Sequence, residues 1–91
     1  MSIRAKFFAT FRELFEARER ELPAAEAPTI GALIERLCDS PARRAALFDG
    51  AALKPHLIIM INGAPVPPSG FAEAPLCDGD VVSIFPLLGG G

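Results

Sequence analysis

The chain has 91 residues, of which 51% are hydrophobic and 22% are charged, and it carries a net charge of −2 at pH 7. This composition is typical of one small globular domain and is too apolar for a disordered chain. The slight negative charge gives no electrostatic reason to expect a nucleic-acid or anionic-membrane partner.

The sequence predicts a cytoplasmic protein. Its first residues alternate between apolar and polar instead of forming the apolar core of a signal peptide. Its apolar runs are also far shorter than the roughly 20 residues of a membrane span. Cys38 and Cys77 have neither metal-binding nor redox-motif spacing. We therefore expect two reduced thiols, no membrane partner and no bound metal.

The N-terminal third predicts two strands. Residues 3–10 are expected to form the first, because apolar residues alternate there with mostly polar ones: Ile3, Ala5, Phe7 and Ala9. Residues 11–15 fit a tight connection or a helical turn. The charged run 12–21 fits either a solvated helix or a hairpin. We favour a hairpin with an edge strand near 18–22, because charges and a flanking proline protect a sheet edge.

The middle of the chain predicts two helices. Thr29 is a plausible N-cap, and it precedes an apolar stripe at helical spacing: Ile30, Leu33, Ile34 and Leu37. This helix should end near Asp39. Ser40 and Pro41 resemble an N-cap followed by proline in the first turn, which predicts a second short helix to about Phe48. Asp49–Gly50 would close it.

The C-terminal third predicts three more strands. Residues 57–61 are continuously apolar and indicate a central strand covered on both faces, followed by an Asn62–Gly63 turn. Residues 64–66 can form only a very short strand because prolines follow. Residues 81–85 fit a strand at the sheet centre, and Pro86 should end its pairing. The expected domain is α+β, with a four- or five-stranded mixed sheet and one main helix on one face.

The last residues are unusual in composition. Leu87 and Leu88 are followed by three glycines, Gly89–Gly91. Residues without a Cβ atom can be extended, thin and mobile. One interpretation is an inert end. The other is that the terminal carboxylate is the working group and the glycines deliver it into a narrow site. We accordingly divide the chain into a domain, 1–86, and a flexible functional tail, 87–91.

Several of these segments together resemble the MoaD/ThiS family of ubiquitin-like β-grasp sulfur carriers. The resemblance rests on an opening Phe-Phe-Ala-x-x-Arg-Glu-Leu pattern at 7–14, Asn62–Gly63, the Asp-Gly-Asp turn at 78–80, and Phe85–Pro86 before a terminal Gly90–Gly91. It covers residues 3–91 and is greatest to the small subunit of molybdopterin synthase. A third glycine, and Leu87–Leu88 where many small subunits carry proline, depart from the usual pattern.

The resemblance implies a mechanism. An activating enzyme of the MoeB/ThiF type would adenylate the Gly91 carboxylate with MgATP, and a persulfide sulfur would replace AMP to leave a thiocarboxylate. A MoaE-like large subunit would then receive the tail, and the sulfur would pass to a pterin precursor. The reacting atom would be at Gly91, beside Gly90, with no cofactor bound to the carrier itself. Extended residues 87–91 would reach roughly 17 Å.

Strand alternation predicts where partners bind. If the odd-numbered residues of the first strand face the helix, four apolar side chains gather on the helix-free face: Phe8, Ile58, Met60 and Phe85. Contiguous exposed apolar residues usually mark an interface. Together with Pro86, Leu87, Leu88 and Gly89 they form the expected partner-binding set. Scattered surface hydrophobes, or cover by the 64–75 loop, are the alternatives.

Other residues and functions remain open at this point. We interpret Cys38 and Cys77 as structural, His56 as non-catalytic, Asp78 and Asp80 as turn residues, and Arg43–Arg44 as a solvated helix face. Arg12–Glu13 fits a surface pair better than an enzyme contact. A carrier for thiamin, tRNA thiolation or a tungsten cofactor, a ubiquitin-like modifier, and a β-grasp binding module with an inert tail are the competing functions.

Overall fold

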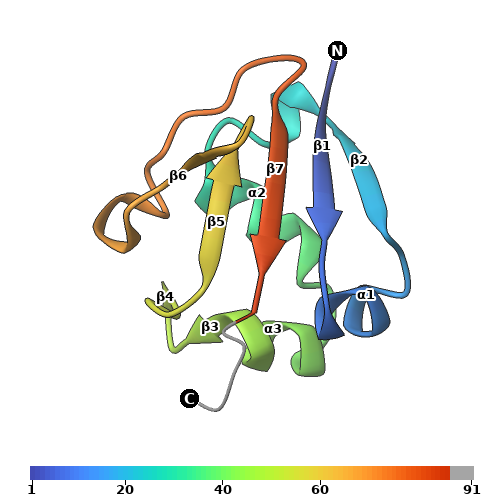
Figure 1. Cartoon of the computed structure of the whole chain (residues 1–91), viewed down its shortest axis with the longest axis vertical. Helices are drawn as coiled ribbons and strands as arrows, with labels where there is room; N and C mark the ends of the chain where they lie inside the picture. The colour runs from blue at the N-terminus through green and yellow to red at the C-terminus, as the bar shows by residue number, and fades with distance from the viewer. Residues whose placement is uncertain (87–91) are drawn as a thin grey trace.

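The computed structural model describes residues 1–86. Within this part of the chain, five strands form one mixed sheet in the order β2-β1-β7-β5-β6 (Figure 1). Their bounds are β1 Ser2–Phe7, β2 Glu19–Pro23, β5 Ile58–Ile61, β6 Ala64–Pro65 and β7 Val81–Phe85. β1 and β7 are parallel, and the other neighbours are antiparallel. The last strand therefore lies at the sheet centre, as predicted.

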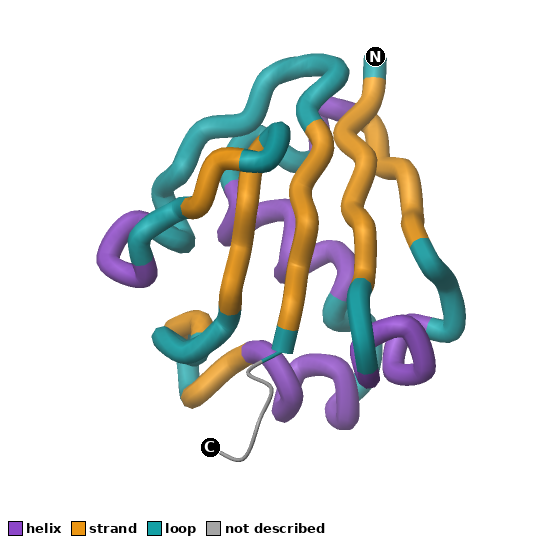
Figure 2. The backbone as a smooth tube through the Cα atoms, in the orientation of Figure 1, coloured by secondary structure: helices purple, strands orange, loops and turns teal. Residues whose placement is uncertain are grey.

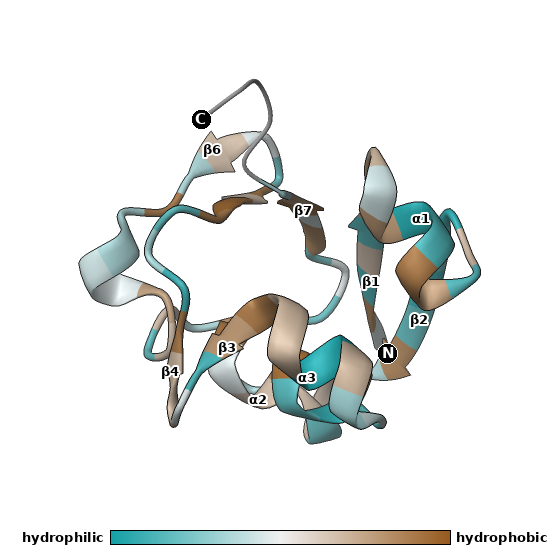
Figure 3. Ribbon diagram, turned by 90° about the horizontal axis from the view of Figure 1, so that it is seen from below, coloured by the Kyte–Doolittle hydropathy of each residue, from teal (hydrophilic) through white to brown (hydrophobic). Residues whose placement is uncertain are grey.

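Helices cover one face of this sheet. They are α2 Ile30–Leu37 and α3 Pro41–Leu47, while α1 Thr10–Phe15 lies beyond the end of β1 (Figure 1) and short 3₁₀ turns form η1 at Ala24–Glu26 and η2 at Pro68–Gly70. Seen along the strands, α2 and α3 lie on the same side of the sheet (Figure 3). This is the predicted α+β arrangement of a β-grasp domain, with a main helix and a short second helix. None of the helices within residues 1–86 is long and apolar enough to cross a bilayer.

The core lies between α2 and the sheet. The four predicted stripe residues of α2 are all fully buried: Ile30, Leu33, Ile34 and Leu37. They meet the inward residues of the strands, which include Ile3, Ala5, Phe7, Ile59, Val82 and Ile84. Both predicted N-caps are present, since Thr29 Oγ1 accepts from the Ala32 amide at 3.1 Å and Ser40 Oγ from the Arg43 amide at 3.2 Å.

Gly31 sets how closely α2 approaches the loop after η2. Its amide donates to the carbonyl oxygen of Ala72 at 3.2 Å. A Cβ atom on Gly31 would lie 2.8 Å from that same oxygen. The sequence alone indicates only that glycine lowers helix propensity at position 31, whereas the structure shows that a larger side chain does not fit there.

Three details of the predicted fold are wrong. The first strand ends at Phe7 instead of residue 10, because Ala9 is exposed with φ 52° and the chain turns into α1. Asp49–Gly50 does not simply close α3. It begins a two-stranded hairpin of β3 Phe48–Asp49 and β4 Ala52–Leu53 (Figure 2). The Asp-Gly pair between Phe48 and Leu53 is a hairpin signal that could have revealed this.

The third error concerns β5. It was expected to be covered on both faces, but Ile58 is 44% exposed while Ile59 is 1% exposed. The part of the chain that the structure describes places helices on one face of the sheet only.

The charged run after α1 forms the edge strand β2, as favoured, with charged side chains along an exposed edge.

Candidate functional site

The end of the sheet where β7 finishes carries a row of apolar side chains. Phe7 pairs with Ile84 across the parallel strands, which places Phe8 beside Phe85. The two rings stack, with centroids 4.2 Å apart and planes 13° from parallel. Ile58 is the register partner of Phe85 on the other side. Phe8, Phe85 and Ile58 thus form one row across three strands, which we call the apolar row.

The row is open to solvent. Phe8, Phe85 and Met60 are partly exposed, and Ile58 is the most exposed large hydrophobe of the domain apart from Met1. Met60 is opposite Ser83 and lies one step further along the same face. The predicted gathering of these four side chains on the helix-free face is therefore present. That a partner binds there stays a prediction.

The row leads directly to the end of the described chain. Pairing of β7 stops at Phe85, and Pro86 follows in irregular, half-buried conformation. The remaining predicted site residues, Leu87, Leu88, Gly89, Gly90 and Gly91, lie outside the described residues. The described chain ends just after the central strand β7, beside the apolar row.

The opposite end of β7 is fixed by a polar network around Asn62 and Asp80. The Asn62 amide group donates to Asp80 Oδ1 at 2.9 Å, and the Asn62 side-chain oxygen accepts from the Val81 amide at 2.9 Å. Asp80 Oδ2 accepts from the Cys77 amide at 2.8 Å. Asn62 and Gly79 adopt the left-handed conformations, φ 52° and φ 87°, that such turns need. Asp80 therefore serves the turn, as predicted, whereas the Asp78 carboxylate accepts from the Ser2 amide at 2.8 Å.

Arg12 does not act as the surface partner of Glu13. Its Nε donates to the Phe7 carbonyl oxygen at 3.0 Å, and its guanidinium lies 5.4 Å from the centroid of the Phe8 ring. The side chain thus holds the end of β1 and borders the apolar row. The first helical turn of α1 places it there, four residues beyond Phe8. Sequence analysis singled out Arg12 but did not predict its contact with the Phe7 carbonyl oxygen.

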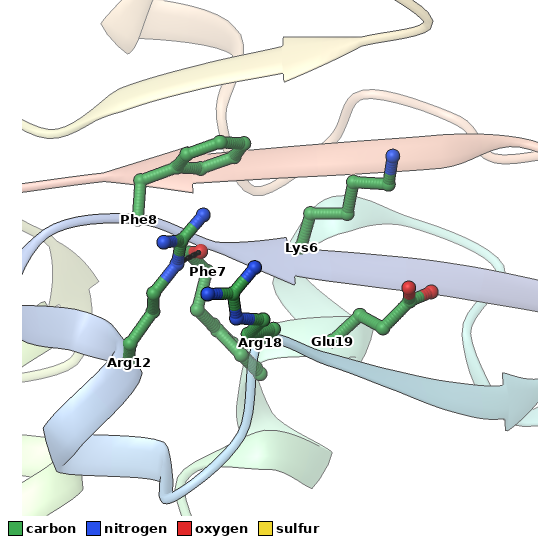
Figure 4. Close-up of a pocket in the computed structure, with 6 residues that line it drawn as sticks. All are labelled: Lys6, Phe7, Phe8, Arg12, Arg18 and Glu19. Carbon is green, nitrogen blue, oxygen red and sulfur yellow. Dashed lines mark hydrogen bonds between the residues drawn. The ribbon is translucent and has the colours of Figure 1, made fainter.

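Arg12 also lines a cavity of about 190 Å³ beside the apolar row. Figure 4 shows its lining residues, Lys6, Phe7, Phe8, Arg12, Arg18 and Glu19. Lys6 and Arg18 carry no signal in the sequence that would join them, since one lies on β1 and the other precedes β2. Only the antiparallel pairing of these strands brings them together.

Arg43 was wrongly interpreted as part of a solvated helix face. Its side chain is 15% exposed, lies over the Phe15 ring at 5.4 Å, and pairs with Asp39 at 2.7 Å. Its Nε also donates to the Leu14 carbonyl oxygen at 3.0 Å, so it ties α1 to α3. Arg44 pairs with Glu35 at 2.6 Å, and this hydrogen bond lowers the pKa of the Glu35 carboxyl. Arg43 and Arg44 therefore both have structural roles.

Neither thiol nor the histidine assembles a reactive group. Cys38 is buried, and desolvation raises the pKa of its thiol to about 11. Cys77 and His56 are exposed on separate loops. Among residues 1–86, no three His, Cys, Asp or Glu side chains gather as a metal ion would require.

Comparison with known proteins places this geometry among related chains. The model of the ThiS family matches residues 5–91. Small archaeal modifier protein 3 of Haloferax volcanii is 30% identical over 92 residues, which cover 100% of both chains.

Solved structures agree in fold. The Haloferax volcanii HVO 2177 protein has a TM-score of 0.80 and 31% identity, covering 100% of this chain and 87% of that one. A Pyrococcus furiosus protein, provisionally named molybdopterin converting factor, subunit 1, has a TM-score of 0.71 and 28% identity, with 97% and 99% coverage.

Proposed function

The chain belongs to the ThiS family, and from this we propose that it is a sulfur carrier whose working group is the Gly91 carboxylate. The observation that carries the proposal is the extent of the family match, which runs through Gly90 and Gly91 to residue 91. The described domain supports it by offering recognition surfaces without a catalytic constellation. The proposal takes Gly91 as the carboxyl terminus of the working protein.

The chemistry follows from the weakness of a carboxylate as an electrophile. An activating enzyme of the MoeB/ThiF type would convert the Gly91 carboxylate and MgATP into an acyl-adenylate and pyrophosphate. A sulfane sulfur would expel AMP, and a thiol would cleave the resulting S–S bond to leave the thiocarboxylate. The carrier's part is to present the tail and to dock its partner through the apolar row and Met60.

For the destination of the sulfur, we favour molybdopterin formation with a MoaE-like large subunit. The motifs of the opening strand and the Asp-Gly-Asp turn support this, as does the likeness to the Pyrococcus furiosus protein named subunit 1 of molybdopterin converting factor. Purified thiocarboxylated chain, incubated with the large subunit of the same organism and the pterin precursor, should yield dithiolene product. No product with an active large subunit would contradict this destination.

A second function is favoured by a specific observation. The 30% identity with Small archaeal modifier protein 3 suggests that the activated glycine could instead be passed to a lysine of another protein. Both functions begin with the same adenylation. The only lysines of this chain are Lys6 and Lys54, so self-conjugation would have few sites.

Intact mass separates the two functions. The chain is incubated with the activating enzyme of its own organism, ATP and a sulfur donor, and then with cell extract. Exchange of one oxygen for sulfur at Gly91 supports the carrier, whereas isopeptide conjugates support the modifier. Gly91→Ala should greatly reduce activation, with Gly89→Ala as the matched control that keeps the Gly90–Gly91 end. An unchanged mass with a competent enzyme would contradict both.

The apolar row is tested with the same enzyme. Phe8→Asp and Met60→Asp introduce a charge on the helix-free face, where desolvating it would oppose docking. Both variants should keep their circular-dichroism spectrum and bind the activating enzyme more weakly. If both fold and neither binds more weakly, the helix-free face is not the partner-binding face.

A further inference from the structure

The cations of this protein are unevenly paired. Of its nine Lys and Arg residues, four form ion pairs within residues 1–86: Arg4, Arg36, Arg43 and Arg44. Five have no such partner there: Lys6, Arg12, Arg18, Arg20 and Lys54. Three of these five, Lys6, Arg12 and Arg18, line the same cavity of about 190 Å³. In a chain with net charge −2, this is a local concentration of uncompensated positive charge.

The one acid of the pocket does not neutralise it. Glu19 lines the cavity, but its carboxylate pairs with Arg4 Nε at 2.9 Å. Figure 4 shows the guanidiniums of Arg12 and Arg18 next to each other, with the Lys6 ammonium on the neighbouring strand. Like charges held together without an anion are unfavourable, so the arrangement gains stability when an anion enters.

The pocket is also partly pre-organised. Arg12 is held by its hydrogen bond to the Phe7 carbonyl oxygen and by the Phe8 ring beneath it. Its remaining guanidinium N–H groups are available to a planar anion, for which arginine has a matching fork. Phe8 belongs both to this pocket and to the apolar row. The two features therefore form one continuous surface.

We propose that the pocket formed by Lys6, Arg12 and Arg18 receives an aspartate or glutamate side chain of a partner protein that lies on the apolar row. The cavity volume is below the roughly 300 Å³ at which small-molecule pockets begin, so it fits one side chain. Three cations beside an apolar surface also differ from the extended basic stripe that nucleic acid requires. The apolar row then supplies the contact area, and the pocket fixes orientation and excludes partners without the acid.

A direct test uses a small carboxylate as the probe. N-acetyl-glutamate is titrated into the isotopically labelled chain while the arginine Nε–H signals are followed by NMR. The Nε–H signals of Arg12 and Arg18 should shift saturably, and that of Arg20 should not, because Arg20 does not line the pocket and lies opposite the buried Ala5. Equal shifts at Arg20, or none at Arg12 and Arg18, would overturn the proposal. Tighter binding of inorganic phosphate would assign the pocket to phosphate instead.

A second test uses the activating enzyme, and this choice of probe rests on the proposed function. The double variant Lys6→Glu/Arg18→Glu should weaken enzyme binding by about tenfold or more, because it places like charges opposite the partner's acid. Arg20→Glu, with the same change per residue, should stay within about twofold. The single variant Lys6→Arg, in which Arg18 is native, keeps both positive charges and should bind the activating enzyme as the native chain does.

The outcomes separate the two hypotheses. If the native chain is activated, and the double variant binds the activating enzyme as tightly as the native chain does, the pocket proposal fails and the proposed function stands. If the native chain is not activated, the proposed function fails, and the carboxylate titration alone decides the pocket. Circular dichroism of each variant verifies that the fold is retained.

Discussion

The two faces of the central sheet are built from alternate residues of the same strands and have opposite environments. On the helix side, Ile59, Val82 and Ile84 are at most 1% exposed. On the other side, Ile58 is 44% exposed and Phe85 is only half-buried, although both are as apolar as their neighbours. Hydrophobicity alone therefore does not distinguish the faces. The difference within residues 1–86 is that α2 covers one face and no helix covers the other (Figure 3).

The largest expected effect compares adjacent residues of β5. Ile59→Ala should lower the free energy of unfolding by about 2–5 kcal/mol, because it leaves a cavity under α2. Ile58→Ala should cost about 1 kcal/mol or less, because much of that side chain is already in water. Both changes remove the same β-branched residue from the same strand, so strand propensity largely cancels. Urea unfolding measures each, and equal losses would show that both faces contribute equally to the core.

The next effect concerns how α2 is seated on its face. Gly31→Ala places a methyl group against the Ala72 carbonyl oxygen. The overpacking cost of about 1–3 kcal/mol should outweigh the gain in helix propensity of about 1 kcal/mol. Thermal unfolding should therefore show a lower midpoint.

Gly70→Ala is the matched control for this substitution. A Cβ atom there meets nothing within 4 Å, so the midpoint should be unchanged or slightly higher. A stabilised Gly31→Ala variant would mean that the loop around Ala72 yields readily and does not fix α2.

The smallest effect is chemical and leaves the fold intact. Iodoacetamide at pH 8 should label exposed Cys77 and largely spare Cys38, which is 8% exposed and whose pKa is raised by burial to about 11. Mass spectrometry should find one label on the native chain and two in urea. Similar labelling rates for both thiols would show that the end of α2 opens frequently.

The same thiol gives a pH dependence with a definite sign. Burial favours the neutral thiol, so its contribution to stability is fully present below about pH 9. It should be lost as pH rises from about 9 to 11, because the thiol of the unfolded chain ionises first. Cys38→Ala should remove this part of the alkaline loss, and unfolding midpoints across this range measure it.

Local patterns were sufficient for much of the fold. Thr29 and Ser40 were identified as caps because capping is decided within three residues, and the stripe on α2 needed only helical spacing. The edge position of β2 and the central position of β7 followed from charge and apolar content. Those features depend on neighbours in sequence or on strand composition.

Long-range contacts explain what the sequence did not reveal. The burial of Arg43 depends on Leu14 and Glu16, which are 29 and 27 residues away. Strand parity placed Ile58 on the helix-free face, but its 44% exposure depends on the absence of a cover over that face within the described domain. The pocket required Lys6 and Arg18 to be brought close by the pairing of β1 with β2, in which Lys6 lies opposite Glu19, and the sequence left this register open. The apolar row, by contrast, followed from strand parity alone.

The parallel pairing of β1 with β7 has a practical consequence for labelling. Because the two strands run in the same direction, the chain enters the sheet at one end and reaches Phe85 at the other (Figure 1). Met1 is 96% exposed and lies at the entry end, beside Asp78. Seven residue steps separate Met1 from Phe8 of the apolar row, which is roughly 23 Å of extended chain. An affinity tag or fluorophore attached before Met1 therefore reports on the protein from the end of the sheet opposite the apolar row.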